Sequence, residues 1–228
     1  MNRHSKRRRD SRGIAKRFID ARLYVLISSH LCHGSVLKTL QEVMRGGADI
    51  VQLREKTMGE SEYLALAKEF RKLTLQSGIL FIVNDHAEIA REVDADGLHI
   101  GQSDCCVQSA RKIIGNDRVL GVSTHNMAQA RRAERAGADY ISVGPVYPTE
   151  TKDFEPPVGL EYIRQVKEGI NIPSVAIGAI NHDNLHDVIH AGGERVAICS
   201  AILCRENVAE ATILLKNQII FYRSQIRN

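Results

Sequence analysis

The sequence predicts an α/β protein whose eight parallel strands, each followed by a helix, close into a single (β/α)8 TIM barrel. Short runs rich in apolar and β-branched residues recur eight times along the 228 residues. Segments with helical periodicity separate these runs. Eight such units in about two hundred residues are close to the usual size of this barrel.

Several of the predicted strands are almost continuously apolar, as expected of parallel strands that are buried on both faces. The eight predicted strands are residues 24–28, 49–55, 80–85, 97–101, 119–123, 140–146, 173–178 and 195–201. An open doubly wound sheet is the alternative architecture. It usually has fewer strands, and no GxGxxG turn follows the first predicted strand.

The segments between the strands predict amphipathic helices. SEYLALAKEFRKLTLQSG and NMAQARRAERAGA, for example, place apolar residues three and four positions apart. Glycines in RGGAD, QSG, RAGAD and HAGGE predict where helices end, because glycine readily adopts the left-handed conformation found there.

Charge divides the chain into two parts. Residues 1–22 carry nine Lys and Arg and two Asp, a local charge of +7, whereas the remainder carries −3. We expect residues 1–22 to form a basic N-terminal extension, either flexible or folded as a short helix that covers one end of the barrel through Ile14, Phe18 and Ile19. Residues 23–228 are the predicted barrel domain.

Composition indicates a globular protein, with 43% hydrophobic and 25% charged residues. No apolar run approaches the ~18 residues that a membrane-spanning helix needs. The N-terminus lacks the apolar segment of a secretory signal. The five cysteines form no CxxC pair and show no zinc-like spacing with histidines. We therefore expect reduced thiols and a cytoplasmic location.

The carboxyl ends of the strands are where barrels of this kind place their chemistry. Gln52, Arg54 and Lys56 end the second predicted strand at alternate positions, so their side chains point to one side. An arginine and a lysine together suit a phosphate or diphosphate. An ion pair with Glu55 or another acid at the rim is the alternative.

Two aspartates follow the next two predicted strands. Asn84 and Asp85 end the third strand, and Asp104 follows the fourth. Two carboxylates and an amide at neighbouring strand ends suit Mg²⁺, which often binds one or two carboxylates together with substrate phosphates. Each aspartate by itself could instead cap the following helix. Their position beside Arg54 and Lys56 favours a metal and a diphosphate.

The fifth and sixth strands add polar groups to the same rim. Ser123 and His125 end the fifth strand, where hydrogen bonds to a substrate are expected rather than a catalytic triad. Thr149, Thr151 and Lys152 follow the sixth strand and supply two hydroxyls and an ammonium group.

Small residues end the last two predicted strands. Gly178 and Ala179 follow the seventh strand, and Cys199 and Ser200 lie near the end of the eighth. Loops at these positions commonly hold a phosphate in such barrels. The rim would then bind anions on two sides, which implies two phosphorylated substrates or one bisphosphate.

These motifs together resemble one known family. From about Leu23 to Leu215, the chain is similar to thiamine phosphate synthases in QLREK, VND, DGLHIGQSD, GVSTHN, YISVGPVYPTETK, PPVGLE and VAIGAI. The resemblance implies a transferase of thiamine biosynthesis, which joins a hydroxymethylpyrimidine diphosphate to a thiazole phosphate. The products would be thiamine phosphate and diphosphate.

The resemblance also implies roles for individual residues. Pyrimidine-diphosphate contacts are implied at Gln52, Leu53, Arg54, Glu55, Lys56, Asn84, Ser123 and Lys152. Catalytic roles among these would belong to Arg54, Lys56, Ser123 and Lys152. Thiazole-phosphate contacts are implied at Thr149, Thr151, Gly178, Ala179, Cys199 and Ser200. Mg²⁺ would be the cofactor, bound by Asp85 and Asp104.

The chain departs from the family pattern beside the thiazole phosphate. Ala179 stands where the family commonly has the second glycine of a pair, so its methyl group would crowd the phosphate or remove a conformation with positive φ. Cys199 stands where an aliphatic residue is expected.

Two alternative functions fit parts of the pattern. A related thiazole tautomerase would share the barrel and use a histidine such as His125. A non-catalytic binding barrel would use its basic extension to contact nucleic acid. We favour the synthase because the aspartates and the Thr-x-Thr-Lys segment are all present. We expect two small-molecule substrates and neither a membrane nor a nucleic acid as partner; a homo-oligomer is compatible with the sequence.

Overall fold

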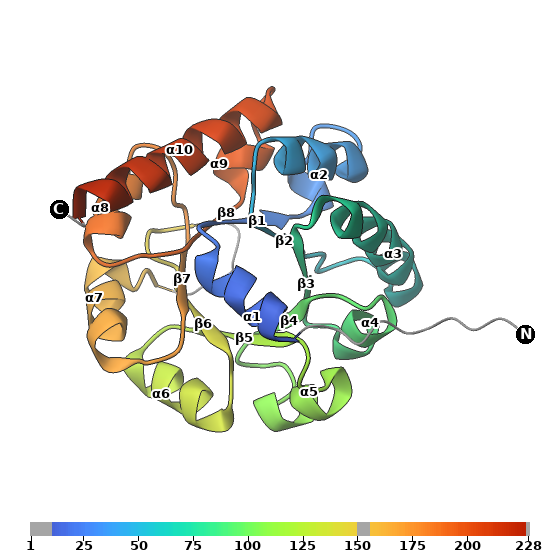
Figure 1. Cartoon of the computed structure of the whole chain (residues 1–228), viewed down its shortest axis with the longest axis horizontal. Coiled ribbons are helices and arrows are strands. Elements are labelled where there is room, and N and C mark those ends of the chain that lie inside the picture. The colour runs from blue at the N-terminus through green and yellow to red at the C-terminus, as the bar shows by residue number, and fades with distance from the viewer. Residues whose placement is uncertain (1–10, 150–155, 227–228) are drawn as a thin grey trace, which may run out of the picture.

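Eight parallel strands form a closed barrel in the computed structural model, which describes residues 11–149 and 156–226 (Figure 1). Each strand pairs with its sequence neighbours and β1 pairs with β8, so the sheet has no free edge. The strands are β1 Leu23–Ile27, β2 Ile50–Leu53, β3 Leu80–Asn84, β4 Gly97–Ile100, β5 Val119–Thr124, β6 Tyr140–Val143, β7 Ser174–Ile177 and β8 Val196–Ile198. The predicted (β/α)8 barrel is confirmed.

Helices surround the barrel, and one further helix lies across its end (Figure 1). The helices are α1 Ser11–Asp20, η1 Ser29–Leu31, α2 Val36–Arg45, α3 Glu60–Ser77, α4 Ala87–Glu92, α5 Val107–Ile114, α6 Met127–Ala136, α7 Gly159–Gly169, α8 Leu185–His190, α9 Ser200–Leu203 and α10 Val208–Ile226. None of these helices is long and apolar enough to cross a membrane.

Strands β6 and β8 end three residues before their patterns predict. β6 ends at Val143, before Gly144 and Pro145, because proline has no N–H for the strand ladder. β8 ends at Ile198, and the chain turns into helix α9 at Ser200, with Cys199 as the residue that precedes the helix. The last two residues of the predicted eighth strand therefore begin a helix instead.

The apolar core has two parts. Most buried residues lie between the strands and the surrounding helices. A second cluster fills the amino-terminal end of the barrel interior and includes Tyr24, Ile82, Val119 and Tyr140. Because this end is filled by side chains, a cavity can open only toward the carboxyl ends of the strands.

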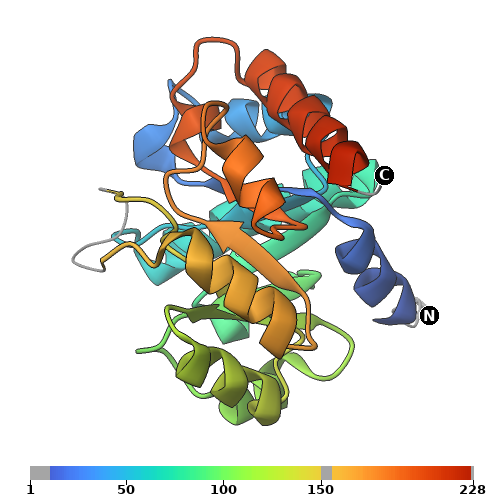
Figure 2. The same cartoon turned by 90° about the vertical axis from the view of Figure 1, so that its left-hand side faces the viewer.

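Helix α1 closes the amino-terminal end of the barrel, as Figure 2 shows from the side. Ile14 and Phe18 are 5% and 2% exposed and belong to the interior cluster. Ile19 is 51% exposed, so its expected role in covering the barrel is wrong. Ile14 and Phe18 lie four positions apart on one helical face, and Ile19 lies off that face. Residues 1–10 of the basic extension lie outside the described residues.

A buried arginine holds α1 in place. Arg195 donates from Nε to the carbonyl of Phe18 over 3.0 Å and from Nη2 to the carbonyl of Ile19 over 2.5 Å. Its guanidinium also lies 6.0 Å from the centre of the Phe18 ring. Burial lowers the pKa of Arg195 to about 10, so the group is still charged at neutral pH. The last carbonyls of the helix thus receive the donors that helix ends require.

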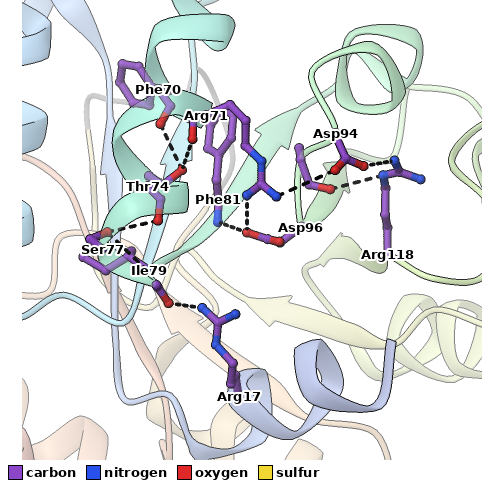
Figure 3. A network of polar contacts seen from close by, with 12 residues as sticks. Arg17, Phe70, Arg71, Thr74, Ser77, Ile79, Phe81, Asp94, Asp96 and Arg118 are labelled. Carbon is purple, nitrogen blue, oxygen red and sulfur yellow. Dashed lines mark hydrogen bonds and ion pairs between the residues drawn. The ribbon is translucent and has the colours of Figure 1, made fainter. Parts of the chain in front are cut away.

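Aspartates at the starts of strands tie neighbouring strands together at this same end. Oδ2 of Asp49 accepts from the backbone N–H of Leu23, and Oδ2 of Asp139 accepts from that of Leu120. Asp96 accepts from the backbone of Phe81 over 2.9 Å and from Arg71 over 3.0 Å (Figure 3). The amino-terminal end of the barrel is therefore built for stability.

Candidate active site

A cavity opens at the carboxyl ends of the strands, opposite α1, with a volume of about 1000 Å³ that includes open space at its mouth. Strand alternation explains which predicted residues reach it, because every second side chain points into the barrel. The predicted residues that line it are Gln52, Arg54, Lys56, Asn84, Asp85, Ser123, His125, Thr149, Gly178, Ala179, Cys199 and Ser200. The structure therefore gathers both predicted anion-binding sides around one space.

Two of the predicted substrate contacts do not line this cavity. Leu53 is fully buried in the outer core. Glu55 accepts hydrogen bonds from the backbone N–H and the hydroxyl of Ser29, over 2.6 and 2.9 Å. Both residues alternate with Gln52 and Arg54, so their side chains point away from the barrel interior. These two side chains therefore do not contribute to the wall of the cavity, and that of Glu55 anchors the loop after β1.

Two more predicted contacts, Thr151 and Lys152, lie outside the described residues. Thr149, just before them, is described and lines the cavity.

A pair of carboxylates lies at one side of the mouth. Asp85 Oδ2 is 2.6 Å from Lys56 Nζ, and Asp104 Oδ2 accepts from the backbone N–H of Gly101 over 2.6 Å. The two carboxyl groups also lie within hydrogen-bonding reach of each other. Neither aspartate is the residue that caps the following helix; those positions belong to His86 and Cys106. The helix-capping alternative therefore does not account for them.

The electrostatics of the pair suit a cation. Burial raises the pKa of Asp85; the hydrogen bond from Lys56 opposes this shift, and Asp104 adds to it. The pKa of Asp104 is lowered, because its hydrogen bonds with Asp85 and Gly101 outweigh the effect of burial. Two adjacent carboxylates in a partly buried site repel each other unless a proton or a cation lies between them.

The donor set also fits Mg²⁺ in number. In the part of the chain that the structure describes, no group of three or more acidic, histidine or cysteine side chains gathers at one point. Asp85 and Asp104 would therefore supply only part of a coordination shell. Mg²⁺ commonly binds in this way, keeping waters and taking its other oxygens from substrate phosphates.

Arg54 lines the cavity from the end of β2. Its backbone N–H donates to Ile27 over 2.9 Å, and its carbonyl accepts from the Ser28 hydroxyl over 2.7 Å, so the end of β2 is held against β1. Burial raises the pKa of the Cys199 thiol to about 12 even though Arg54 lies close enough to lower it. Cys199 is therefore a neutral thiol that lines the wall, and Arg54 is a cation within the cavity.

A family model described as thiamine monophosphate synthase matches residues 23–202. The chain belongs to the thiamine monophosphate synthase family. The family resemblance predicted from the motifs is thus confirmed, and the match covers all eight strands of the barrel.

Individual members of the family match nearly the whole chain. The thiamine-phosphate synthase of Shouchella clausii (strain KSM-K16) is 44% identical over 193 residues, covering 84% of this chain and 92% of that protein. That of Alkaliphilus oremlandii (strain OhILAs) is 43% identical over 202 residues, covering 88% and 97%. The solved structure of thiamine phosphate pyrophosphorylase from Pyrococcus furiosus has a TM-score of 0.81 and 33% identity, covering 89% of this chain and 96% of that one.

The departure from the family pattern at Ala179 can now be described. Gly178 has a φ of +116°, and an added Cβ would lie 2.5 Å from Cα of Pro145, so only glycine fits there. Ala179 keeps a φ of +48° despite its methyl group. The expectation that alanine would remove the positive φ is therefore wrong. The Asn184 side chain donates to the Ala179 carbonyl over 3.0 Å and helps to hold this conformation.

His99 is a cavity residue that the sequence analysis missed. It lines the cavity from β4 and lies 3.0 Å from the Ser123 hydroxyl through Nε2, with a longer contact of 3.5 Å to Ser142. A lone histidine in an apolar strand resembles an ordinary core residue. The sequence signal that could have found it is alternation along the strand. His99 lies two residues before Gly101, at the strand end, so the two residues face the same side, the barrel interior.

Proposed function

We propose that this chain joins 4-amino-2-methyl-5-(diphosphooxymethyl)pyrimidine to 4-methyl-5-(2-phosphoethyl)thiazole, releasing diphosphate and forming thiamine phosphate. The observation that carries the proposal is one cavity with two kinds of anion-binding wall. Arg54, Lys56 and Asp85 form one wall, and Asp104 lies beside Asp85 without lining the cavity itself. Gly178, with its positive φ, and Ser200 form the other. Membership of the family supports this assignment.

The chemistry follows from the charges. The bond between the pyrimidine methylene carbon and the diphosphate oxygen breaks, and the electron pair leaves with the diphosphate. Arg54 and Lys56 stabilise the negative charge that develops there, and Lys152 is assigned the same role. The aminopyrimidine delocalises the resulting cation. The lone pair of the thiazole nitrogen then forms the new carbon–nitrogen bond, so no protein nucleophile or base is needed.

Asp85 and Asp104 are the residues that would hold Mg²⁺. When bound, this ion would neutralise charge on the departing diphosphate. Lys56 contacts Asp85 directly and therefore connects the aspartate pair to the cationic wall.

The second wall positions the other substrate. Gly178 lacks a side chain, and the Thr149 and Ser200 hydroxyls line the cavity, so all three can approach the phosphate of the thiazole. Holding both substrates in line accounts for much of the rate, because the reaction becomes effectively intramolecular. We also propose a cytoplasmic location, which the five free thiols support, and a homo-oligomer.

The test is product formation by the purified full-length chain. Both substrates are supplied with and without Mg²⁺, diphosphate release is followed, and thiamine phosphate is identified by mass. Product that requires both substrates would support the synthase. Absence of product from folded protein and intact substrates would refute it, and conversion of one thiazole phosphate isomer into another would point to the tautomerase.

Asp104→Asn tests the metal assignment. The variant should need about tenfold or more Mg²⁺ for half-maximal turnover, because one of two charged ligands is lost. Asp117→Asn is the matched control, since Asp117 is exposed and lies before β5, at the other end of the barrel. An unchanged Mg²⁺ requirement in Asp104→Asn would contradict the assignment.

A further inference from the structure

A continuous series of buried hydrogen bonds crosses the barrel interior beneath the cavity. Gln52 Nε2 donates to the Tyr24 hydroxyl over 2.9 Å, and the Tyr24 and Tyr140 hydroxyls are 3.3 Å apart. The Tyr140 hydroxyl is 3.0 Å from His99 Nδ1, and His99 Nε2 is 3.0 Å from the Ser123 hydroxyl. We call these five residues the Gln52–Ser123 network. Its two ends line the cavity, whereas its two tyrosines do not.

The network has a defined direction. An amide nitrogen can only donate, so the Tyr24 hydroxyl accepts from Gln52. Every hydrogen of the network has a partner when Tyr24 gives its own proton to Tyr140. The Tyr140 hydroxyl then donates to His99 Nδ1. In this arrangement, His99 carries a proton on Nε2 and none on Nδ1, and it donates the Nε2 proton to Ser123.

Burial keeps this arrangement intact. Tyr24 and Tyr140 are 3% and 0% exposed, and burial raises the pKa of both hydroxyls well above the ordinary value. Both tyrosines therefore carry exactly one proton each across the working pH range. A polar group left unpaired at this depth would destabilise the protein, so the hydrogens are held in a single pattern.

The direction decides what each end can offer to a ligand. Gln52 uses one hydrogen of its amide nitrogen on Tyr24, and its carbonyl oxygen has no hydrogen-bond partner among the described residues. That oxygen can accept a hydrogen bond from a ligand in the cavity. Ser123 already accepts from His99, so its own proton can be donated to a ligand. One end of the network is an acceptor and the other is a donor.

We propose that Tyr24, Tyr140 and His99 are positioning residues that set this polarity, so that the cavity selects a pyrimidine with an amino group over one with an oxo group. The inference rests on the proposed function. The amino group of the pyrimidine would donate to the Gln52 carbonyl, and an oxygen of the diphosphate would accept from Ser123. Both ends of the network then match the same substrate.

The network makes this selection stronger than a lone glutamine could. An isolated glutamine accepts either partner, because its amide can rotate by half a turn. Here, rotating the Gln52 amide would turn its carbonyl toward Tyr24. The hydroxyls of Tyr24 and Tyr140, the tautomer of His99 and the hydroxyl of Ser123 would all have to reverse with it. An oxo-pyrimidine would therefore face either an opposed acceptor or this collective reversal.

Tyr140→Phe tests the inference, because it removes one link and keeps the ring. The measured quantity is the ratio of kcat/KM for the 4-amino and 4-oxo pyrimidine diphosphates. We expect the ratio to fall about tenfold, with a higher KM for the amino substrate and an unchanged KM for the thiazole phosphate. Tyr162→Phe is the matched control: its hydroxyl lies 2.8 Å from the Thr124 hydroxyl and 2.9 Å from the Asn126 carbonyl, outside the network, and the ratio should stay unchanged.

A double variant separates positioning from simple packing. Breaking the network at either tyrosine should remove the same selectivity, so Tyr24→Phe/Tyr140→Phe should lower the ratio no further than the more damaging single variant. If the two tyrosines acted independently, the fold-losses in the ratio from the two single variants would multiply in the double variant, and this result would contradict a shared network.

The His99 tautomer is a second readout that does not depend on turnover. In the unaltered full-length chain, nitrogen-15 NMR should show the proton of His99 on Nε2 and a hydrogen-bonded acceptor at Nδ1. The resonance is assigned by its absence from His99→Gln. This measurement keeps the inference testable even if the tyrosine variants fail to fold.

The outcomes are distinguishable. Product formation by the unaltered protein, together with an unchanged ratio in Tyr140→Phe, would overturn the inference and leave the proposed function standing. A proton found on His99 Nδ1 by NMR would also overturn the inference and leave the proposed function standing. Absence of product from the unaltered protein would overturn both. A reduced ratio in Tyr140→Phe but not in Tyr162→Phe, with the Nε2 tautomer, would support the inference.

Discussion

Ala179 combines a side chain with a backbone conformation that favours glycine. Its φ of +48° brings Cβ close to the following carbonyl oxygen, which costs roughly 1–2 kcal/mol for an ordinary residue. The loop after β7 nevertheless keeps this conformation, because Asn184 bonds both the Ala179 carbonyl and the backbone N–H of Asn181. Local hydrogen bonds thus offset the strain at a wall of the cavity.

Ala179→Gly should therefore stabilise the protein. We expect the free energy of unfolding in urea to rise by about 0.5–1 kcal/mol, since the strain removed exceeds the extra backbone entropy of glycine. Ala65→Gly, at an exposed position within α3, is the control and should lose about 1 kcal/mol. A loss of similar size in both variants would show that Ala179 is not strained.

At the scale of elements, acids at the strand starts join each strand to its neighbour. Asp96 is 4% exposed and accepts from Phe81 in β3 and from Arg71 in α3 (Figure 3). Asp94, two residues earlier, also pairs with arginine, but 62% of its side chain is exposed. Solvent screens the exposed carboxylate of Asp94 much more than the buried carboxylate of Asp96, so the two acids contribute unequally to stability.

Asp96→Asn should cost about 3 kcal/mol of unfolding free energy, because it removes the buried and nearer carboxylate, at 3.0 Å, from the guanidinium of Arg71, which is only 13% exposed and keeps only the exposed Asp94 at 3.9 Å. Asp94→Asn is the matched control and should change stability by less than about 1 kcal/mol. Urea denaturation of both variants measures the difference. Similar losses at the two positions would argue against the structural role of Asp96.

Considered as a whole, the molecule is a barrel with one end filled and the other open. Helix α1 covers the filled end, and the Phe18 ring lies 4.3 Å from the Tyr140 ring. Tyr140 in turn belongs to the network beneath the cavity. The helix that closes the barrel therefore also packs against a residue that positions the site.

Phe18→Ala should cost about 3–5 kcal/mol, because it opens a cavity in the barrel interior. Ile19→Ala, next to it but 51% exposed, should change stability by no more than about 0.5 kcal/mol. Thermal or urea unfolding of the full-length chain distinguishes them. A small effect of Phe18→Ala would mean that α1 contributes little to closing the barrel.

The sequence by itself determined the class of fold, the order of the strands and most of the rim. These features depend on local patterns: apolar runs, helical periodicity and the alternation of side chains along a strand. That alternation also placed Gln52, Arg54 and Lys56 on one side of the strand. By the same rule, the side chains of Leu53 and Glu55 point away from the cavity, as the structure shows.

Only the tertiary structure decided which buried polar groups meet. Tyr24 and Tyr140 lie 116 positions apart in the chain, and neither differs in pattern from an ordinary core tyrosine. The direction of their hydrogen bonds depends on Gln52 at one end and His99 at the other, which belong to different strands. Contacts between strands are set by closure of the barrel and its register, and no local pattern records them.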